Sequence, residues 1–293
     1  MRAALLEWAE AHGRVLPIRE LRDPWAVLVI ETMSQQTQIG RVEARAPAFL
    51  RQFPTPERLA RATTGELLRA WAGLGYNRRA IALREAARRI VSEHGGEVPA
   101  TVAGLLALPG VGPYTARAVA VRAFGAPVAA LDVNVARVMG RVFGRSGDLP
   151  RAALQEASDA LVDPVRPSAW TDAVMDLAVA VCWARSPVCP VCPVREGCAT
   201  GTGRAGPTGE PATAAPRPRR TPASPSDPVP YTRTRRWLRG RLLAELRVLA
   251  QGEWLHIDGS RGEHGSAEVS EALQALERDA IVELDPERGA RLR

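Results

Sequence analysis

The sequence predicts an all-α protein over residues 1–200, followed by a linker and a small α+β module. Three observations lead to this prediction. Apolar residues recur at helical spacing through most of this region. Proline and glycine stand where helices begin and end. No segment before residue 230 has the alternating pattern of a convincing strand.

The expected helices follow one another with short turns. The apolar segment 25–37 has enough Val and Ile for a strand, but its length and the helical pattern that continues through Val42 and Ala46 favour a helix that ends or kinks near the glutamines. The other helices are expected over residues 1–13, 57–61, 64–71, 79–94, 113–124, 132–143, 151–162 and 169–181, with one more just before the turn at 109–112. Thr64 is expected as an N-cap, and Gly95 as a helix end.

The composition changes after residue 200. Residues 201–230 hold eight prolines and almost no large apolar residue, which predicts a linker. Residues 231–293 then resume a helical and strand-like pattern that is typical of a small winged-helix-like module. Its expected elements are a basic helix over 234–249, a strand over 252–257, a helix over 266–278, and a hairpin of 280–284 with 288–292.

Charge and hydropathy narrow the class of protein. The net charge of +7 favours a polyanionic partner, although an ordinary basic surface would give the same value. No apolar run of 18 residues is present, and the charged N-terminus lacks the apolar core of a signal peptide. We therefore expect a cytoplasmic protein with no membrane partner.

Lysine is missing from the chain, so every basic side chain that carries a full charge is an arginine. A Schiff base with a sugar aldehyde needs an amine, and the N-terminus is the one that remains. The sequence therefore argues against Schiff-base chemistry. Arginine is suited instead to bidentate contacts with phosphate.

The stretch 104–137 carries the strongest functional signal. A short apolar helix leads into Leu108-Pro109-Gly110-Val111-Gly112, and a second helix begins at Pro113. A glycine-rich turn at a helix N-terminus presents backbone N–H groups to an anion, here a nucleic-acid phosphate. Asp132 follows twenty residues after Gly112 between apolar runs. A simple helical turn and an aspartate that caps the next helix are the alternative.

These residues resemble a known family. The segments LPGVGPYTA (108–116) and LDVNVARV (131–138), the Glu-x4-Gln-Thr segment (31–37), the GLGY turn (73–76) and a four-cysteine loop are together similar to helix–hairpin–helix DNA glycosylases of the endonuclease III and MutY branch. The resemblance covers residues 1–200 and implies a two-lobed fold. It assigns residues 23–132 to a helical barrel lobe, and residues 1–22 with 133–200 to an iron–sulfur lobe.

The resemblance to MutY-type adenine glycosylases implies three catalytic positions. Glu31 would protonate the purine N7 and then activate water, and its burial would raise the carboxyl pKa. Asp132, ionised, would stabilise the oxocarbenium-like sugar. Tyr114 stands where bifunctional relatives have a lysine, which favours a monofunctional hydrolase. The alternative for Glu31 is a salt-bridged helix glutamate.

The resemblance also implies a base pocket. Arg19 and Asp176 match residues near the base, with Asp176 reading the adenine edge; the alternative for Asp176 is a carboxylate that faces loop arginines. Two positions depart from the family pattern, because Ile18 replaces a usual tryptophan and Ser34 a usual leucine. These changes make a wider or more polar pocket and put adenine as substrate in doubt.

Contacts with DNA are implied at two further segments and at the hairpin. Gln35 and Gln36 would fill the space left by a flipped base, or else form a polar helix end. Tyr76 would intercalate beside the orphaned base, or else be a core tyrosine; Asn77 replaces a common second aromatic residue. The other expected contacts are Thr37, Pro109, Gly110, Val111, Gly112 and Thr115.

The four cysteines lie within residues 182–198 and are expected to bind one compact centre. Their pattern is Cys-x6-Cys-x2-Cys-x5-Cys, formed by Cys182, Cys189, Cys192 and Cys198. Thiolates suit zinc or an iron–sulfur cluster. Since the spacing matches the cluster loop of the family, a structural [4Fe–4S] cluster is expected, with zinc or free thiols as alternatives.

The C-terminal residues differ from the usual family tail. They are too few for a Nudix-like domain that inspects 8-oxoguanine, and no Phe-Ser-His loop is present. If this module binds DNA, its phosphate contacts are expected at Arg233, Arg235, Arg236 and Arg239.

The sequence thus predicts a monomeric, nucleoid-associated DNA glycosylase that acts on duplex DNA with a mispair or lesion. Adenine opposite 8-oxoguanine or guanine is the leading substrate. One alternative is a thymine, uracil or other damaged-base glycosylase of the same superfamily. Another is a non-catalytic iron–sulfur DNA-binding module, which the presence of both Glu31 and Asp132 argues against.

Overall fold

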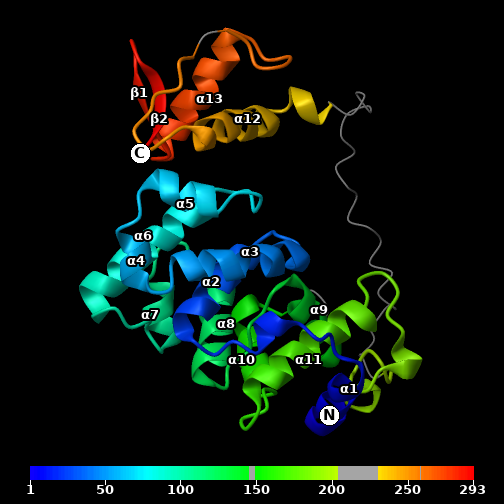
Figure 1. Ribbon diagram of the computed structural model, residues 1–293. Coiled ribbons are helices and arrows are strands. Elements are labelled where there is room, and N and C mark those ends of the chain that lie inside the picture. Colours follow the sequence, from blue (N-terminus) through cyan, green and yellow to red (C-terminus); the bar gives the residue numbers. More distant parts are fainter. Residues whose placement is uncertain (145–148, 204–229, 258) are drawn as a thin grey trace. The chain divides into compact units, whose positions relative to one another are not determined.

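The structure, a computed structural model, describes residues 1–144, 149–203, 230–257 and 259–293. Within these ranges the chain forms thirteen α-helices and one two-stranded sheet (Figure 1). The contacts between residues divide it into two compact units. Unit 1 combines Met1–Gln35 with Glu97–Arg219, and unit 2 combines Gln36–Gly96 with Arg220–Arg293.

The regular elements of unit 1 are all helices or 3-10 turns over its described residues. Its elements are α1 (Arg2–His12), the 3-10 turn η1 (Pro17–Arg19), α2 (Pro24–Ser34), α7 (Val102–Leu106), α8 (Pro113–Phe124), α9 (Val133–Val142), α10 (Arg151–Asp159), α11 (Pro167–Ala180), and the 3-10 turns η2 (Cys189–Val191) and η3 (Arg195–Gly197). Helix α2 packs on α8, and α11 packs on α1, α8 and α9. The contacts of α11 bring α1, from the start of the chain, into one apolar core with α9 and α11.

Helix α2 is buried over almost its whole length. Asp23 caps it by accepting a hydrogen bond of 2.8 Å from the Ala26 N–H, and Pro24 occupies the first helical position. All nine residues from Trp25 to Met33 are buried. The helix ends at Ser34, because the Gln35 backbone leaves the helical region. The expectation of a helix that ends near the glutamines is therefore confirmed.

Helices α7 and α8 form the expected hairpin. Thr101 caps α7, and the left-handed backbone of Gly110 (φ 76°) makes the turn that a side chain would strain. Gly112 and Pro113 open α8, whose last turn ends at Gly125 in the left-handed conformation. The N-terminus of α8 has no side-chain cap, so backbone N–H groups of its first turn remain available.

Unit 2 contains the remaining helices and the sheet. Its elements are α3 (Ile39–Gln52), α4 (Pro56–Ala60), α5 (Thr64–Ala70), α6 (Arg78–His94), the 3-10 turn η4 (Tyr231–Arg233), α12 (Arg235–Val248), α13 (Ser266–Arg278), β1 (Val282–Asp285) and β2 (Gly289–Leu292). Thr63, rather than the expected Thr64, caps α5. It does so because its side chain and that of Glu66 bond reciprocally to the two backbone N–H groups.

Over its described residues, the C-terminal module has one strand fewer than expected. Strands β1 and β2 pair antiparallel with Val282 opposite Leu292, and α12 packs on α13. The strand expected over 252–257 is wrong, since this segment makes a single bridge from Leu255 to Ala290. Residue Gly252 (φ 87°) turns the backbone just before that bridge, and β2 already pairs with β1 along its whole length.

Most of the expected linker, residues 204–229, lies outside the described residues. Among the described helices, none combines the length and the apolar character that a membrane span requires.

Candidate active site

A buried carboxylate on α2 is the starting point of the site. Glu31 is 7% exposed and its neighbours in the helix are apolar or hydroxyl-bearing. Its Oε1 atom lies 3.2 Å from Nε of Arg122, a residue of α8, the helix that packs on α2. The Arg122 guanidinium also holds Asp172 of α11, with Nη2 2.6 Å from Oδ1 and Nη1 3.3 Å from Oδ2. Three helices therefore meet at one ion-pair cluster.

The ion pairs continue from Asp172 to the chain between α1 and α2. Arg19 in η1 places Nε 3.0 Å from Oδ1 of Asp172, and it donates from Nη1 and Nη2 to both oxygens of Asp176 at 2.8 Å. Arg14 donates to the same carboxylate from Nε at 2.7 Å and from its backbone N–H at 3.0 Å. Carboxylates and guanidinium groups alternate along this path from Glu31 to Arg14.

Burial and the alternating charges together set the direction in which each pKa in the cluster is shifted. Burial raises the pKa of Glu31, and the charge of Arg122 opposes this increase without cancelling it. Burial acts to lower the pKa of Arg122, but Glu31 and Asp172 outweigh it and the pKa is raised. Hydrogen bonds from Arg19 and Arg14 together overcome burial and lower the pKa of Asp176. Of the Glu31 and Asp176 carboxyl groups, Glu31 is thus the one more ready to hold a proton.

Asp176 has no free acceptor site for a base. It accepts four hydrogen bonds from Arg14 and Arg19, which matches the lone pairs that a carboxylate offers. The geometry therefore matches the alternative of a carboxylate that faces loop arginines, and it makes Asp176 a residue that holds Arg19 in place.

Tyr114 and Asp132 lie beside this cluster. Burial, followed by the charge of Glu31, raises the pKa of the Tyr114 phenol, and Asp132 and Asp172 act in the same direction. Tyr114 therefore remains a neutral hydroxyl at any physiological pH. The structure brings together the three catalytic residues expected from the sequence, Glu31, Tyr114 and Asp132.

Asp132 is also the N-cap of α9. Its Oδ1 accepts from the N–H groups of Asn134 at 2.8 Å and Val135 at 2.7 Å, and Oδ2 accepts from the Asn134 amide at 2.9 Å. The capping alternative is therefore correct as a description of its bonds. Capping also fixes the carboxylate in the half-buried position next to Tyr114, so the two roles are compatible.

The hairpin turn is joined to α2 through Gln35. The Gln35 amide donates 3.1 Å to Thr115 Oγ1 on α8, and it lies 3.5 Å from the Gly110 carbonyl oxygen. Thr115 is buried, while Pro109, Gly110 and Gly112 are partly exposed around the open N-terminus of α8. Of the two positions that depart from the family pattern, Ser34 donates its hydroxyl to the Ile30 carbonyl oxygen at 2.8 Å, and Ile18 is half-buried in η1.

Unit 2 holds the other expected DNA contacts, Gln36, Thr37 and Tyr76. Gln36 (φ 54°) and Tyr76 (φ 45°) have left-handed backbone, which only Ala280 shares among the described non-glycine residues. Such backbone is costly and concentrates at functional positions. Tyr76 is 48% exposed, so it is no core tyrosine.

An arginine that sequence reasoning missed supports the Tyr76 turn. Arg79 donates from Nη2 to Thr37 Oγ1 at 3.0 Å and to the Leu74 carbonyl oxygen at 3.1 Å. Its guanidinium also stands 5.4 Å from the Trp71 ring centre and 5.5 Å from that of Tyr76. Thr37 and Tyr76 are thereby held by one side chain.

The four cysteines line one pocket of unit 1 beneath α9 and α11. The donor set fits a thiolate-bound group, since Arg141 donates to Cys182 Sγ at 3.2 Å and the Gly201 N–H to Cys198 Sγ at 3.3 Å. Burial raises the pKa of the free thiols of Cys192 and Cys198. Among the described residues, no three or more His, Cys, Asp or Glu side chains are close enough to hold one metal ion.

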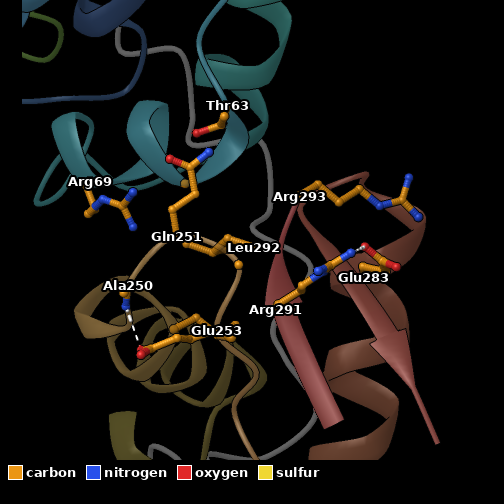
Figure 2. Close-up of a pocket in the computed structure, with 12 residues that line it drawn as sticks. Thr63, Arg69, Ala250, Gln251, Glu253, Glu283, Arg291, Leu292 and Arg293 are labelled. Carbon is orange, nitrogen blue, oxygen red and sulfur yellow. Dashed lines mark hydrogen bonds and ion pairs between the residues drawn. The ribbon is translucent and has the colours of Figure 1, made fainter. Parts of the chain in front are cut away.

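A separate cavity lies in unit 2, between the start of α5 and the end of α12 with β2 (Figure 2). Its charged side chains are engaged: Arg291 bonds Glu283 at 2.8 Å, and Glu253 accepts from the Ala250 N–H at 2.8 Å. The Gly65 N–H donates to the Arg293 carbonyl oxygen at 3.2 Å nearby. This cavity contains none of the expected catalytic residues.

Sequence reasoning missed Arg122 and Asp172, which occupy the centre of the ion-pair cluster. A signal for Arg122 was present, because it interrupts the apolar run from Ala118 to Phe124 and a buried charge requires a partner. Asp172 lies one helical turn before Asp176 on α11, so the same face of that helix carried two candidates.

Comparison with known proteins agrees with this geometry. A model of the HhH-GPD superfamily of base excision DNA repair proteins matches residues 29–164. An adenine DNA glycosylase of Mycobacterium tuberculosis (strain CDC 1551 / Oshkosh) is 39% identical over 291 residues, which cover 95% of this chain and 88% of that protein. A solved thermostable thymine-DNA glycosylase is similar with a TM-score of 0.65 and 30% identity, over 69% of this chain and 95% of that chain. A non-covalent endonuclease III–DNA complex is similar with a TM-score of 0.59 and 26% identity, over 69% of this chain and 95% of that chain.

Proposed function

Because this chain belongs to the HhH-GPD superfamily of base excision DNA repair proteins, we propose that it is a monofunctional adenine DNA glycosylase. It flips a mispaired adenine out of duplex DNA and hydrolyses the N-glycosidic bond. One observation carries the proposal: the buried Glu31 carboxyl, with its raised pKa, stands with Tyr114 and Asp132 in a single cluster.

The reaction follows from the protonation states of these groups. Protonated Glu31 donates to N7 of adenine, the C1′–N9 bond breaks, and adenine leaves as a neutral molecule. The ionised Asp132 stabilises the positive charge on the sugar, as one carboxylate does in glycosidases. Glu31, now a carboxylate, takes a proton from the water that attacks C1′. The Tyr114 hydroxyl remains neutral and donates a hydrogen bond at the sugar.

Arg19, Ile18, Ser34 and Asp176 are proposed to border the base pocket, with Asp176 acting through Arg19. The four hydrogen bonds to Asp176 fix the Arg19 guanidinium beside Asp172, and this supports a positioning role. The small Ser34 and the aliphatic Ile18 leave the pocket less aromatic than in typical relatives.

Strand cleavage through a Schiff base is not part of the proposed activity. The chain has no lysine to supply the amine that a Schiff base needs. Tyr114, which stands where bifunctional relatives have that lysine, carries a phenol that stays protonated. Borohydride should therefore trap no covalent complex between the protein and DNA that contains the scissile adenine.

Duplex DNA with a mispair or lesion is the proposed partner of a monomeric protein. The open N-terminus of α8, with Gly110, Val111 and Gly112 before it, would bind a phosphate. Gln35, Gln36 and Thr37 would occupy the space left by the flipped base, and Tyr76 would stack beside it. Pro109 and Thr115 would border the phosphate site. A cytoplasmic, nucleoid-associated location follows from this partner.

Cys182, Cys189, Cys192 and Cys198 are proposed to hold a [4Fe–4S] cluster. Their spacing, their common pocket and the N–H donors to two of the sulfur atoms support this assignment. The cluster when bound supplies a structural cross-link of the loop and no part of the bond cleavage. We further propose that residues 1–200 form the glycosylase domain and residues 231–293 a separate module after the linker.

Single-turnover release of adenine from a duplex that contains adenine opposite 8-oxoguanine tests the proposal. The wild type should release adenine, whereas Glu31→Gln and Asp132→Asn should bind the duplex and release no base. Binding without release by the wild type would instead support a non-catalytic DNA-binding module. Release of thymine or uracil in place of adenine would support the alternative that Ile18 and Ser34 favour.

A further inference from the structure

Arg122 brings a full positive charge into the base-release site. Its side chain is 12% exposed and lies on α8 between residues that are otherwise apolar. A buried charge is tolerated when partners compensate it, and here Glu31 and Asp172 do so from two other helices. The reaction proposed above requires a proton on Glu31, yet this partner binds its ionised form.

We propose that Arg122 is a positioning residue that acts through Glu31 and lowers the rate of adenine release. Its ion pair with Glu31 favours the ionised form of that side chain, and base release proceeds from the molecules in which Glu31 carries a proton. This inference rests on the proposed function, since it concerns the acid of that same reaction.

The groups around Glu31 explain why Arg122 has this effect. From α8, Arg122 favours the carboxylate, while Tyr114 remains neutral. From α11, Asp172 disfavours a second negative charge. Asp132 at the start of α9 acts on Tyr114, whose pKa it helps to raise, and Arg19 is occupied by Asp172. Arg122 is therefore the cation that offsets burial at Glu31.

The pH dependence of the release rate should show the effect of Arg122 on the protonation of Glu31. Release falls as pH rises through the pKa of Glu31, because the acid loses its proton. Without Arg122, burial and Asp172 both favour the protonated form, so this fall should occur at a higher pH. Removal of an arginine from the site is thus expected to increase the rate in alkaline solution, an effect that simple structural damage would not produce.

Arg122→Leu is the decisive variant, and the structure suggests that it folds. Asp172 keeps the Nε atom of Arg19 at 3.0 Å, and leucine fits the apolar surroundings on α8. Arg122→Lys, which retains a positive charge, should restore the wild-type pH profile and provides the second variant. Arg117→Leu is the matched control, because Arg117 is on the same helix and binds Asp159 through both carboxylate oxygens at 2.9 and 3.0 Å, away from Glu31.

The experiment measures single-turnover adenine release against pH for the four proteins. In Arg122→Leu the midpoint of the fall should move upward by about one pH unit or more, and above both midpoints this variant should be about tenfold faster than the wild type for each such unit. Arg117→Leu should leave the midpoint unchanged even where it lowers stability. An Arg122→Leu midpoint that equals that of the wild type, or lies below it, would overturn the inference.

A readout without DNA separates this inference from the proposed function. Carbon NMR of labelled glutamate carboxyl groups follows the titration of Glu31, identified as the signal lost in Glu31→Gln. The midpoint should be higher in Arg122→Leu than in the wild type. If it is higher but no adenine is released at any pH, the proposed function fails while the control of Glu31 by Arg122 is supported. If the two midpoints coincide, the inference is overturned whatever base is released.

Discussion

Glu31 owes its chemical character to its place in a buried helix rather than to its sequence neighbours alone. Burial raises its pKa and Arg122 opposes the rise, so the folded chain keeps this proton to a higher pH than the unfolded chain does. The stability that this provides is complete below the ordinary pKa of glutamate, about 4.3, and is lost as pH rises through the raised value.

This linkage predicts a stability effect of Glu31→Gln. Glutamine cannot ionise, so the free energy of unfolding of the variant should increase relative to the wild type as pH rises from about 4.3 through the raised pKa. Urea unfolding at a series of pH values measures the difference. Glu10→Gln, at an exposed glutamate of α1, should show no such increase. A constant difference for Glu31→Gln across this range would contradict the account of its pKa.

Tyr76 is predicted to act by stacking. Tyr76→Ala should lower the rate of base release at limiting protein by about tenfold to a hundredfold, because base–aromatic stacking contributes about 1–3 kcal/mol. Tyr76→Phe keeps the ring and the half-exposed position, so its rate should stay near that of the wild type. Equal losses in both variants would assign the effect to the hydroxyl group and remove the stacking role.

The residues of the site differ in how far the sequence could predict them. Glu31, Tyr114 and Asp132 stand in recognisable segments, and the structure brings them together. Arg122 and Asp172 do not, because the sequence shows only that Arg122 interrupts an apolar run, while the importance of both residues comes from their pairing between α8 and α11. Asp176 was expected at a base edge, but its bonds to Arg14 and Arg19 depend on how the chain after α1 folds back onto α11.

At the scale of elements, the hairpin of α7 and α8 combines two features that can be predicted from the sequence. Gly110 provides the left-handed turn, and Gly112 with Pro113 opens a helix whose N-terminus lacks a side-chain cap. Helix starts and ends were predictable where Pro, Thr, Asp or Gly marks them. The single bridge at Leu255 was not, since pairing with β2 depends on tertiary contacts.

Gly112→Ala tests the hairpin as a phosphate site. An added methyl group meets nothing within 4 Å in the free protein, so stability should be unchanged. In the complex that methyl group would crowd the phosphate at the start of α8, and DNA affinity should fall by about tenfold, the value of one hydrogen bond to a charged group. Fluorescence anisotropy measures the affinity. Gly40→Ala, at an equally open glycine, is the control. An unchanged affinity in Gly112→Ala would place the phosphate elsewhere.

The cysteine loop makes a prediction at the same scale. Protein purified without oxygen should contain iron and acid-labile sulfide in equal amounts, and Cys198→Ser should lose both with a fall in thermal stability, because Cys198 is a buried donor. Iron, zinc and acid-labile sulfide are measured in both proteins. Zinc without sulfide in the wild type would contradict the cluster assignment and support a zinc site.

At the scale of the whole molecule, the arginines that give the chain its positive charge differ in their partners. In the C-terminal module Arg233, Arg235 and Arg239 each bond an acidic side chain, whereas the Arg236 guanidinium stands 5.2 Å from the ring centre of Tyr76. Of the four arginines expected to contact phosphate, Arg236 is therefore the one that the structure associates with the proposed wedge. The net charge alone could not distinguish among them.

The all-helical character before residue 230 and the final hairpin were predictable over the described residues, because each rests on local periodicity. The bounds of the two compact units do not follow from local periodicity. Unit 1 joins Met1–Gln35 to a segment that begins only after 61 intervening residues, at Glu97, and this requires knowledge of which helices pack together.

The most direct test of the central claim is single-turnover base release on one set of labelled duplexes. The set contains adenine opposite 8-oxoguanine, adenine opposite guanine, thymine opposite guanine and uracil opposite guanine, each cleaved afterwards with hot alkali. The account predicts release of adenine from the first two duplexes and no release by Glu31→Gln. Release of thymine or uracil, with adenine left intact, would contradict it and would favour the alternative in which Ile18 and Ser34 make a pocket for another base.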